Sequence, residues 1–124
     1  MSRRTILLVE DHADIREAIR LLLTLEGYEV VAAEDGITAI CLLRQCRPDL
    51  ILTDLMMPEM DGRELIRCVR ELDRLSALPI VAFSAFPGPH LEEAVRCGAN
   101  AALRKPDNLP DLAAAVARAL GGSG

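Results

Sequence analysis

The chain has the length, composition and charge of one globular α/β domain. Its 124 residues are 51% hydrophobic and 27% charged, and with one Tyr, two Phe and no Trp its core must be mainly aliphatic. A formal net charge of −5, with a single lysine, argues against a general nucleic-acid-binding surface. The apolar run 19–25 contains Arg20 and is shorter than the ~20 residues of a membrane-spanning helix, and the N-terminus lacks a signal-peptide pattern. We therefore expect a cytoplasmic protein.

The four cysteines, Cys41, Cys46, Cys68 and Cys97, show no Cys-x-x-Cys spacing. Structural zinc sites commonly use that spacing, and disulfide frameworks are typical of small secreted chains. We therefore expect reduced thiols without a metal or disulfide role.

Five short segments have the character of β-strands. Residues 5–9, 50–53 and 80–83 are continuous apolar runs bounded by polar residues or proline, as is typical of parallel strands covered on both faces. These should be the central strands. The segments 28–32 and 101–103 are more mixed or shorter, which favours the edges of a sheet.

Helical patterns fill the intervals between these segments. Apolar residues recur every three or four positions, for example at Leu65, Val69 and Leu72. The boundaries carry capping and stop residues, with Asp35 and Asp61 as N-caps and with Gly27, Pro48 and Pro79 after helices. Alternating strands and helices predict five βα units around a parallel sheet, in one domain over residues 1–120 with a flexible Gly-Gly-Ser-Gly tail at 121–124.

Polar residues follow four of the five predicted strands. Glu10 and Asp11 follow the first, Asp54 the third, Ser84 the fourth and Lys105 the fifth. In an open parallel sheet the carboxyl ends of the strands form the ligand site, so these side chains should converge. Three neighbouring carboxylates suit a hard divalent cation such as Mg²⁺, and the hydroxyl and the lysine suit a phosphoryl group. These groups predict phosphoryl transfer, with one carboxylate as the nucleophile.

The same motifs resemble those of response-regulator receiver domains, over residues of about 5 to 120. They are Leu-Leu-Val-Glu-Asp at 7–11, Asp-Leu-Met-Met-Pro-Glu-Met-Asp-Gly at 54–62, Phe-Ser-Ala at 83–85, Cys-Gly-Ala at 97–99 and Lys-Pro at 105–106. The resemblance implies a flavodoxin-like (βα)5 three-layer sandwich whose five-stranded parallel sheet has the order 2-1-3-4-5. It also implies a switch in two-component signalling that takes a phosphoryl group from a histidine kinase or a phosphotransfer protein, and is not a conventional enzyme.

The resemblance implies a metal site built on the first and third strands. Asp54 is the implied phosphoacceptor, and Asp11 and Asp54 are implied direct ligands of Mg²⁺. The backbone carbonyl of Met56 is the implied third ligand, and Glu10 is expected to act through water.

Two further residues are implied to contact the phosphoryl group. Ser84 corresponds to the hydroxyl that moves to meet it, and Lys105 to the lysine that pairs with it. The bond between Lys105 and Pro106 is similar to one that is cis in the family.

The sequence departs from the family in its expected output region. Receivers commonly carry Tyr or Phe in the fifth strand, but the aligned residue here is Ala102. Two prolines within residues 86–89 should delay or shorten the fourth helix. We expect a monomer or weak dimer that either stands alone or derives from a hybrid kinase, with an unidentified effector.

The two histidines and two bulky residues have simpler interpretations. His12 is expected to be a polar residue at a helix entry, and His90 a surface residue near the start of the fourth helix. Met56 and Phe86 should flank the phosphoryl site, where they would restrict attacking water and slow dephosphorylation.

Three other functions remain as alternatives. An aspartyl-phosphate phosphohydrolase would need a second Asp two residues after the nucleophile, where this chain has Met56. A flavodoxin-type FMN binder would need a Ser/Thr/Gly-rich first loop, but residues 10–14 are acidic. A phosphorylation-independent interaction module stays open because of Ala102.

Overall fold

The structure is a computed structural model that describes residues 3–86, 88–104 and 109–121. Five parallel strands form one sheet in the order β2-β1-β3-β4-β5, which confirms the predicted order. The strands are β1 (Thr5–Val9), β2 (Glu29–Ala33), β3 (Leu50–Asp54), β4 (Ile80–Ser84) and β5 (Ala101–Arg104). The three central strands are therefore those with the continuous apolar runs.

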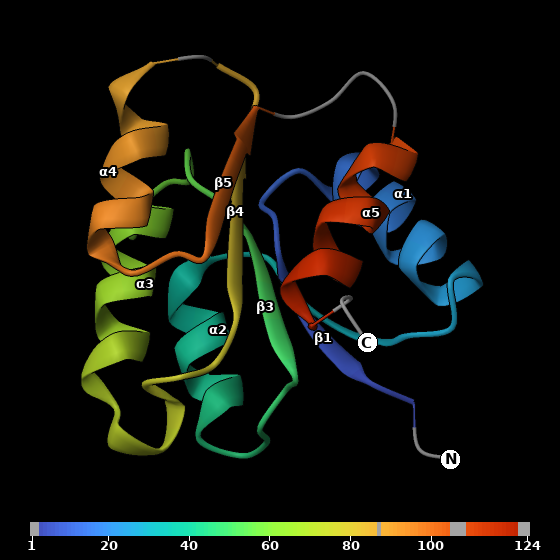
Figure 1. The fold of residues 1–124 in the computed structure, drawn as a ribbon, viewed down its shortest axis with the longest axis horizontal. Coiled ribbons are helices and arrows are strands. Elements are labelled where there is room, and N and C mark those ends of the chain that lie inside the picture. The colour runs from blue at the N-terminus through green and yellow to red at the C-terminus, as the bar shows by residue number, and fades with distance from the viewer. Residues whose placement is uncertain (1–2, 87, 105–108, 122–124) are drawn as a thin grey trace.

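Helices cover both faces of the sheet. They are α1 (Ala13–Leu25), α2 (Gly36–Leu43), α3 (Gly62–Glu71), α4 (Pro89–Cys97) and α5 (Leu109–Ala119), with a short 3₁₀ turn η1 (Asp73–Leu75) after α3. Figure 1 shows α1 and α5 on one face and α2, α3 and α4 on the other. This is the predicted three-layer sandwich. In the described part of the chain no helix is long and apolar enough to cross a membrane.

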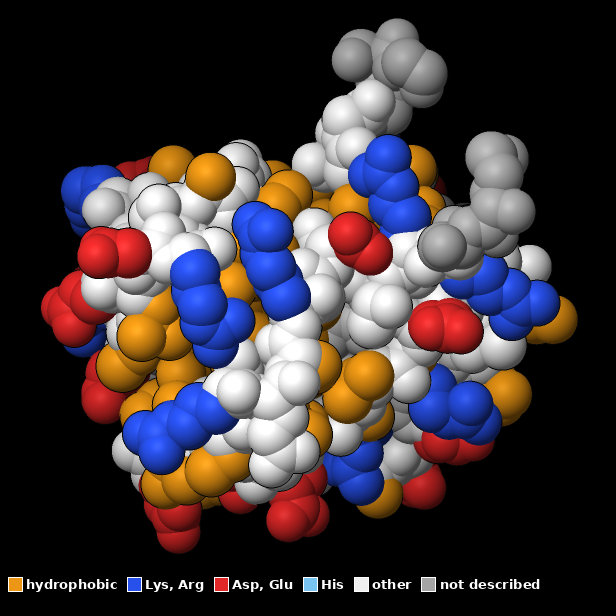
Figure 2. Space-filling model, turned by 90° about the horizontal axis from the view of Figure 1, so that it is seen from below, with side chains coloured by type: hydrophobic (Ala, Val, Ile, Leu, Met, Phe, Trp, Pro, Cys, Tyr) orange, Lys and Arg blue, Asp and Glu red, His pale blue; other side chains and the backbone are white. Residues whose placement is uncertain are grey.

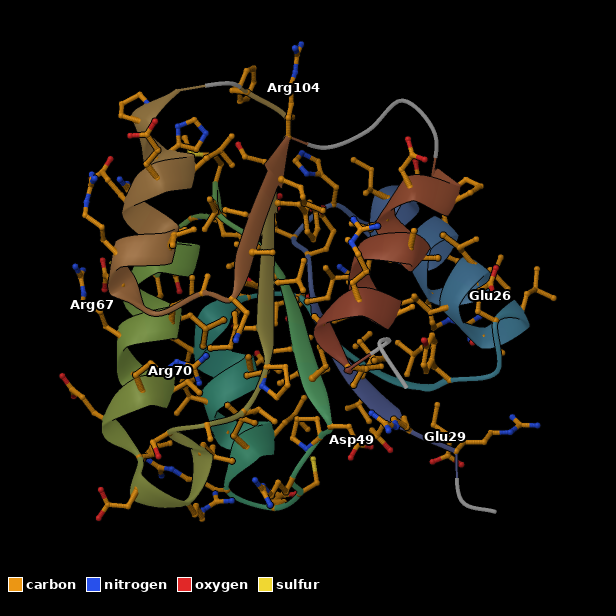
Figure 3. The ribbon with its side chains drawn as sticks, viewed as in Figure 1. Glu26, Glu29, Asp49, Arg67, Arg70 and Arg104 are labelled. Carbon is orange, nitrogen blue, oxygen red and sulfur yellow. The ribbon has the colours of Figure 1, made fainter. Side chains whose placement is uncertain are left out.

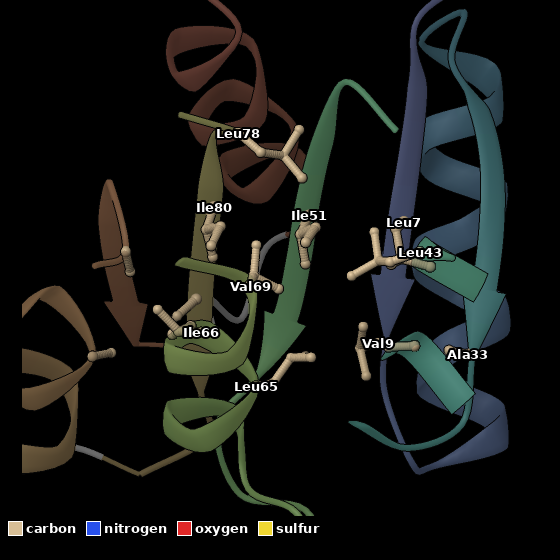
Figure 4. Packing of buried hydrophobic residues seen from close by; sticks show 14 of the residues in the cluster. Leu7, Val9, Ala33, Leu43, Ile51, Leu65, Ile66, Val69, Leu78 and Ile80 are labelled. Atoms are coloured by element: carbon tan, nitrogen blue, oxygen red, sulfur yellow. The ribbon is translucent and has the colours of Figure 1, made fainter. Parts of the chain in front are cut away.

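Each face of the sheet has its own aliphatic core. On the face of α2, α3 and α4, side chains of α3 such as Leu65, Ile66 and Val69 lie over Ile51 and Ile80 of the sheet (Figure 4). The core on the other face contains residues of α1 and α5 packed on the sheet: Ile6, Leu8, Ile19, Leu23, Leu50, Leu52, Val81, Phe83, Leu112 and Val116. Because strands alternate their side chains between faces, two cores require central strands with apolar residues on both faces.

Two helices begin at a capping aspartate and a third begins at a proline. Asp35 accepts a hydrogen bond from the Thr38 N–H, and Asp61 accepts bonds from the N–H groups of Arg63 and Glu64, so both predicted N-caps are confirmed. Helix α4 begins at Pro89, has only nine residues, and thus agrees with the predicted short fourth helix.

Candidate functional site

The site lies at the carboxyl ends of the central strands, where β1 and β3 run side by side. Val9 pairs with Thr53, so Glu10 leaves β1 beside the position at which Asp54 ends β3. The Glu10 N–H still bonds to the Ala33 carbonyl at 3.1 Å, which keeps the residue in line with the strand. Glu10 is 0% exposed and Asp54 only 4%, so two carboxylates are buried at this edge.

An acidic cluster forms where β1 meets α1. Glu10, Asp11 and His12 each place one ligand atom within 4.8 Å of the others, and Asp54 is not a member of this close group. His12 Nδ1 lies 3.3 Å from Glu10 Oε2 and 3.4 Å from Asp11 Oδ1, contacts that become ion pairs when the imidazole is protonated. The prediction gave His12 no part in the site, because sequence alone did not show that its ring turns back onto the carboxylates.

A buried oxygen of Asp11 gives the strongest support for a cation site. Its Oδ1 is the one buried side-chain oxygen in the described part of the chain that has no hydrogen-bond partner. His12 Nδ1 lies 3.4 Å from it, and a buried carboxylate oxygen that makes no hydrogen bond is costly unless a cation compensates its charge. Oxygen ligands held close together are also the set that Mg²⁺ prefers, so the residues present fit this ion.

Arg16 holds the loop that carries the acidic pair. Its Nη1 donates to the main-chain carbonyl of Glu10 at 2.9 Å and approaches that of Asp11 at 3.5 Å. The guanidinium therefore ties the first turns of α1 to the end of β1. Sequence reasoning missed this residue, because nothing in the spacing says that an arginine on α1 turns toward backbone oxygens.

Asp54 is held by hydrogen bonds from the residues on both sides of it. The Met56 N–H donates to Asp54 Oδ1 at 3.1 Å, and Thr53 Oγ1 donates to the Asp54 main-chain carbonyl at 2.8 Å. The next residue, Leu55, is anchored by its N–H to the Phe83 carbonyl of β4 at 2.9 Å. These bonds fix where the carboxylate leaves the sheet.

The loop between β3 and α3 ends at a charged N-cap. Asp61 pairs with Arg63 at 3.1 Å and caps α3. Burial alone would raise the pKa of Asp61, but the hydrogen bonds from the Arg63 side chain and from the N–H groups of Glu64 and Arg63 outweigh it and lower that pKa. Arg63 also reaches Glu93 of α4 at 3.1 Å, so the loop is connected to the neighbouring helix.

Ser84 ends β4 and is fully buried. Its Oγ accepts a bond from the Phe86 N–H at 3.2 Å and lies 2.9 Å from Nε2 of His90. His90 is half-buried at the start of α4, which confirms its predicted position. It is more than a surface residue, however, because its ring also contacts Ser84.

The predicted role of Lys105 and the predicted cis bond between Lys105 and Pro106 lie outside the described residues. Met56 and Phe86 are 48% and 62% exposed, so both side chains lie at the surface. Ala102 pairs with Ala82 in the β4–β5 register, and β5 consists of two alanines, Leu103 and Arg104. The described fifth strand thus carries no aromatic ring.

The immediate surroundings of Asp11 are acidic. An open hollow of ≈ 290 Å³ beside Asp11 is lined by Glu34, Asp35, Pro58 and Glu59. Figure 3 shows Arg104 pointing away from the end of β5 at this edge of the sheet. At the other end, where the strands begin, both basic and acidic side chains stand among hydrophobic ones (Figure 2). The negative charge of the hollow favours a cation near Asp11.

Comparison with known proteins identifies the family. The family model described as the response regulator receiver domain matches residues 6–117. The chain belongs to this family. The polar-differentiation response regulator DivK of Brucella anthropi is 33% identical over 119 residues, which are 95% of this chain and 97% of that protein.

Solved receiver structures share the fold over almost the whole chain. The chemotaxis response regulator CheY4 of Vibrio cholerae has a TM-score of 0.88 and 31% identity, over 95% of this chain and 99% of that one. The response regulator TrrA of Thermotoga maritima, solved in complex with Mg²⁺-BeF, has a TM-score of 0.84 and 27% identity, over 94% of this chain and 98% of its own. The protein is thus a receiver domain of two-component signalling, a class of signalling proteins distinct from conventional enzymes.

Proposed function

We propose that this receiver domain accepts a phosphoryl group on Asp54 from a phosphohistidine of a sensor histidine kinase or phosphotransfer protein. A carboxylate oxygen of Asp54 attacks the phosphorus, a P–O bond forms, and the P–N bond to the donor imidazole breaks with its electron pair passing to that nitrogen. The reaction is a transfer between proteins, and a change in the receiver surface carries the signal to an effector.

The observation that carries the proposal is the buried carboxylate of Asp54 beside the acidic loop of β1. Asp54 is 4% exposed, and its Oδ1 is oriented by the Met56 N–H. A nucleophile held in place by backbone bonds loses little freedom on reaction, which lowers the barrier. The Thr53 hydroxyl bonds to the Asp54 carbonyl, and the Leu55 N–H bonds to the Phe83 carbonyl of β4, so the backbone that flanks the carboxylate is fixed.

We assign the Mg²⁺ site to Glu10, Asp11, Asp54 and the backbone carbonyl of Met56, with Glu10 acting through water. The buried Oδ1 of Asp11, which makes no hydrogen bond within the described part of the chain, supports this assignment. When bound, Mg²⁺ supplies positive charge that offsets the carboxylates and the phosphoryl oxygens. The relative TrrA, solved with Mg²⁺-BeF, is consistent with it.

Ser84 and Lys105 are proposed to contact the phosphoryl oxygens. Ser84 ends the strand next to Asp54 and carries a hydroxyl that can donate to an anion. A lysine ammonium is a compact cation suited to phosphate oxygen.

We further propose a domain over 1–120, a tail at 121–124, a cytoplasmic location and a monomer or weak dimer.

The experiment that tests the function is the intact mass after incubation with Mg²⁺ and acetyl phosphate. Wild-type protein should gain one phosphoryl group, Asp54→Asn should gain none, and a chelator should abolish the adduct. Asp73→Asn is the matched control, because Asp73 lies on η1 in an exposed position away from the site. A folded wild-type protein without an adduct would refute the proposal and favour the phosphorylation-independent interaction module.

A further inference from the structure

The hydroxyl of Ser84 is bound by the segment that follows it. Its Oγ accepts from the Phe86 N–H at 3.2 Å and lies 2.9 Å from His90 Nε2. The same Nε2 lies 2.7 Å from the Phe86 carbonyl oxygen. A carbonyl only accepts, so Nε2 carries the proton, and this single N–H is shared between the carbonyl oxygen and the hydroxyl oxygen.

Gly88, the residue before α4, packs closely against the His90 ring. Gly88 has φ +147°, and a Cβ there would lie 3.1 Å from two atoms of the His90 ring. Pro89 then starts α4 and fixes the first helical position. His90 is therefore attached to the rigid start of the helix, while its Nε2 is bonded to the end of β4.

The strand pattern places Ser84 and Asp54 toward different faces of the sheet. Ser84 alternates with Phe83 and shares the face of Ala82, whose side chain belongs to the core under α2, α3 and α4. Asp54 pairs with Phe83, which belongs to the core under α1 and α5. A Ser84 hydroxyl that meets a phosphoryl group on Asp54 must therefore turn away from His90.

We infer that His90 is a positioning residue that holds Ser84 on the α4 side and transmits its displacement to the start of α4. The inference rests on the proposed function. It also accounts for output from a receiver whose β5 offers Ala102 where an aromatic ring would otherwise report the movement of Ser84. In this receiver, the movement of Ser84 is passed through His90 to α4.

The first test is the affinity for beryllofluoride with Mg²⁺. His90→Phe keeps a ring but removes the donor, so the cost of releasing Ser84 disappears, and the affinity should rise by about fivefold, the equivalent of one ordinary hydrogen bond. His90→Gln, which keeps an N–H donor, should bind like wild type. Glu92→Gln is the matched control, because Glu92 is an exposed residue in the first turn of α4.

A double variant separates positioning from a structural role. In a Ser84→Ala background, His90→Phe should no longer change the affinity, because the contact it removes is already absent. If His90 merely stabilises α4, its substitution would have the same effect with or without the serine hydroxyl. An equal effect in both backgrounds would overturn the inference.

NMR of the wild-type protein provides a readout that needs no folded variant of His90. On addition of Mg²⁺ and beryllofluoride the His90 imidazole ¹⁵N signal and the α4 amide signals should shift, and in Ser84→Ala they should stay in place although the probe binds. If wild type binds the probe with unmoved His90 and α4 signals, the inference fails and the proposed function stands. A wild type that takes neither beryllofluoride nor a phosphoryl group refutes both.

Discussion

Gly62 packs against Asp54 so closely that a Cβ on the glycine would collide with the main-chain oxygen of Asp54. The same Cβ would lie 2.8 Å from the Cα of Leu55, and both obstacles are backbone that cannot rotate away. The Gly62 N–H also donates to the Leu55 carbonyl at 3.0 Å. The start of α3 is thus in direct contact with the chain that presents the phosphoacceptor.

Gly62→Ala should damage both stability and phosphorylation. The added methyl group must displace backbone at the end of β3, which we expect to cost about 1–3 kcal/mol of unfolding free energy. Urea denaturation and the rate of phosphorylation by acetyl phosphate measure the two effects. Gly27→Ala is the contrasting variant, since its Cβ meets no atom within 4 Å but its φ of +98° strains alanine. It should lower stability alone, and equal phosphorylation rates in both variants would contradict the argument.

Asp61→Ala should lower stability by about 1 kcal/mol at neutral pH, because it removes the N-cap of α3. The pKa of Asp61 is lower in the folded protein than its ordinary value of 3.8. A lowered carboxyl pKa contributes stability that is fully present above 3.8 and is lost as the pH falls through the folded value. The stability difference between wild type and Asp61→Ala, measured by urea denaturation, should therefore shrink below pH 3.8. A difference that grows with acid would reverse the expected sign.

Arg16→Ala should weaken Mg²⁺ binding by about tenfold, since outer groups that orient metal ligands typically have effects of this size. The guanidinium fixes the Glu10 carbonyl, and without it the acidic loop loses its attachment to α1. Titration calorimetry with Mg²⁺ measures the change. Arg20→Ala is the control, because Arg20 lies one turn further along α1 and pairs with exposed Glu17. Unchanged Mg²⁺ affinity in Arg16→Ala would show that the loop holds its shape without this bond.

Met56→Asn should shorten the lifetime of the phosphorylated form. Met56 is 48% exposed two residues after Asp54, where an apolar side chain hinders the approach of water and an amide would assist it. The decay of the phosphorylated mass species, followed after removal of the donor, measures the lifetime. Leu25→Asn, at an 86% exposed position at the end of α1, should leave it unchanged. Equal decay in wild type and Met56→Asn would refute shielding by this residue.

Most of the fold was predictable because it depends on local pattern. The central strands β1, β3 and β4 coincide with the three apolar runs, with β3 and β4 each extending one residue further, to Asp54 and Ser84. The edge strand β2 begins at Glu29 and not at Tyr28, because its register is decided by pairing with β1. Edge segments have weaker patterns, so their bounds depend more on neighbours.

The sequence by itself determined the alternation of strands and helices, the caps at Asp35 and Asp61, and the order of the motifs that carry Glu10, Asp11 and Asp54. These follow from residue type and spacing along the chain. Only the tertiary structure decided that Arg16 binds the Glu10 carbonyl and that His90 reaches the hydroxyl of Ser84. Such contacts depend on how side chains turn after the helices have packed on the sheet, and short-range pattern carries no information about that rotation.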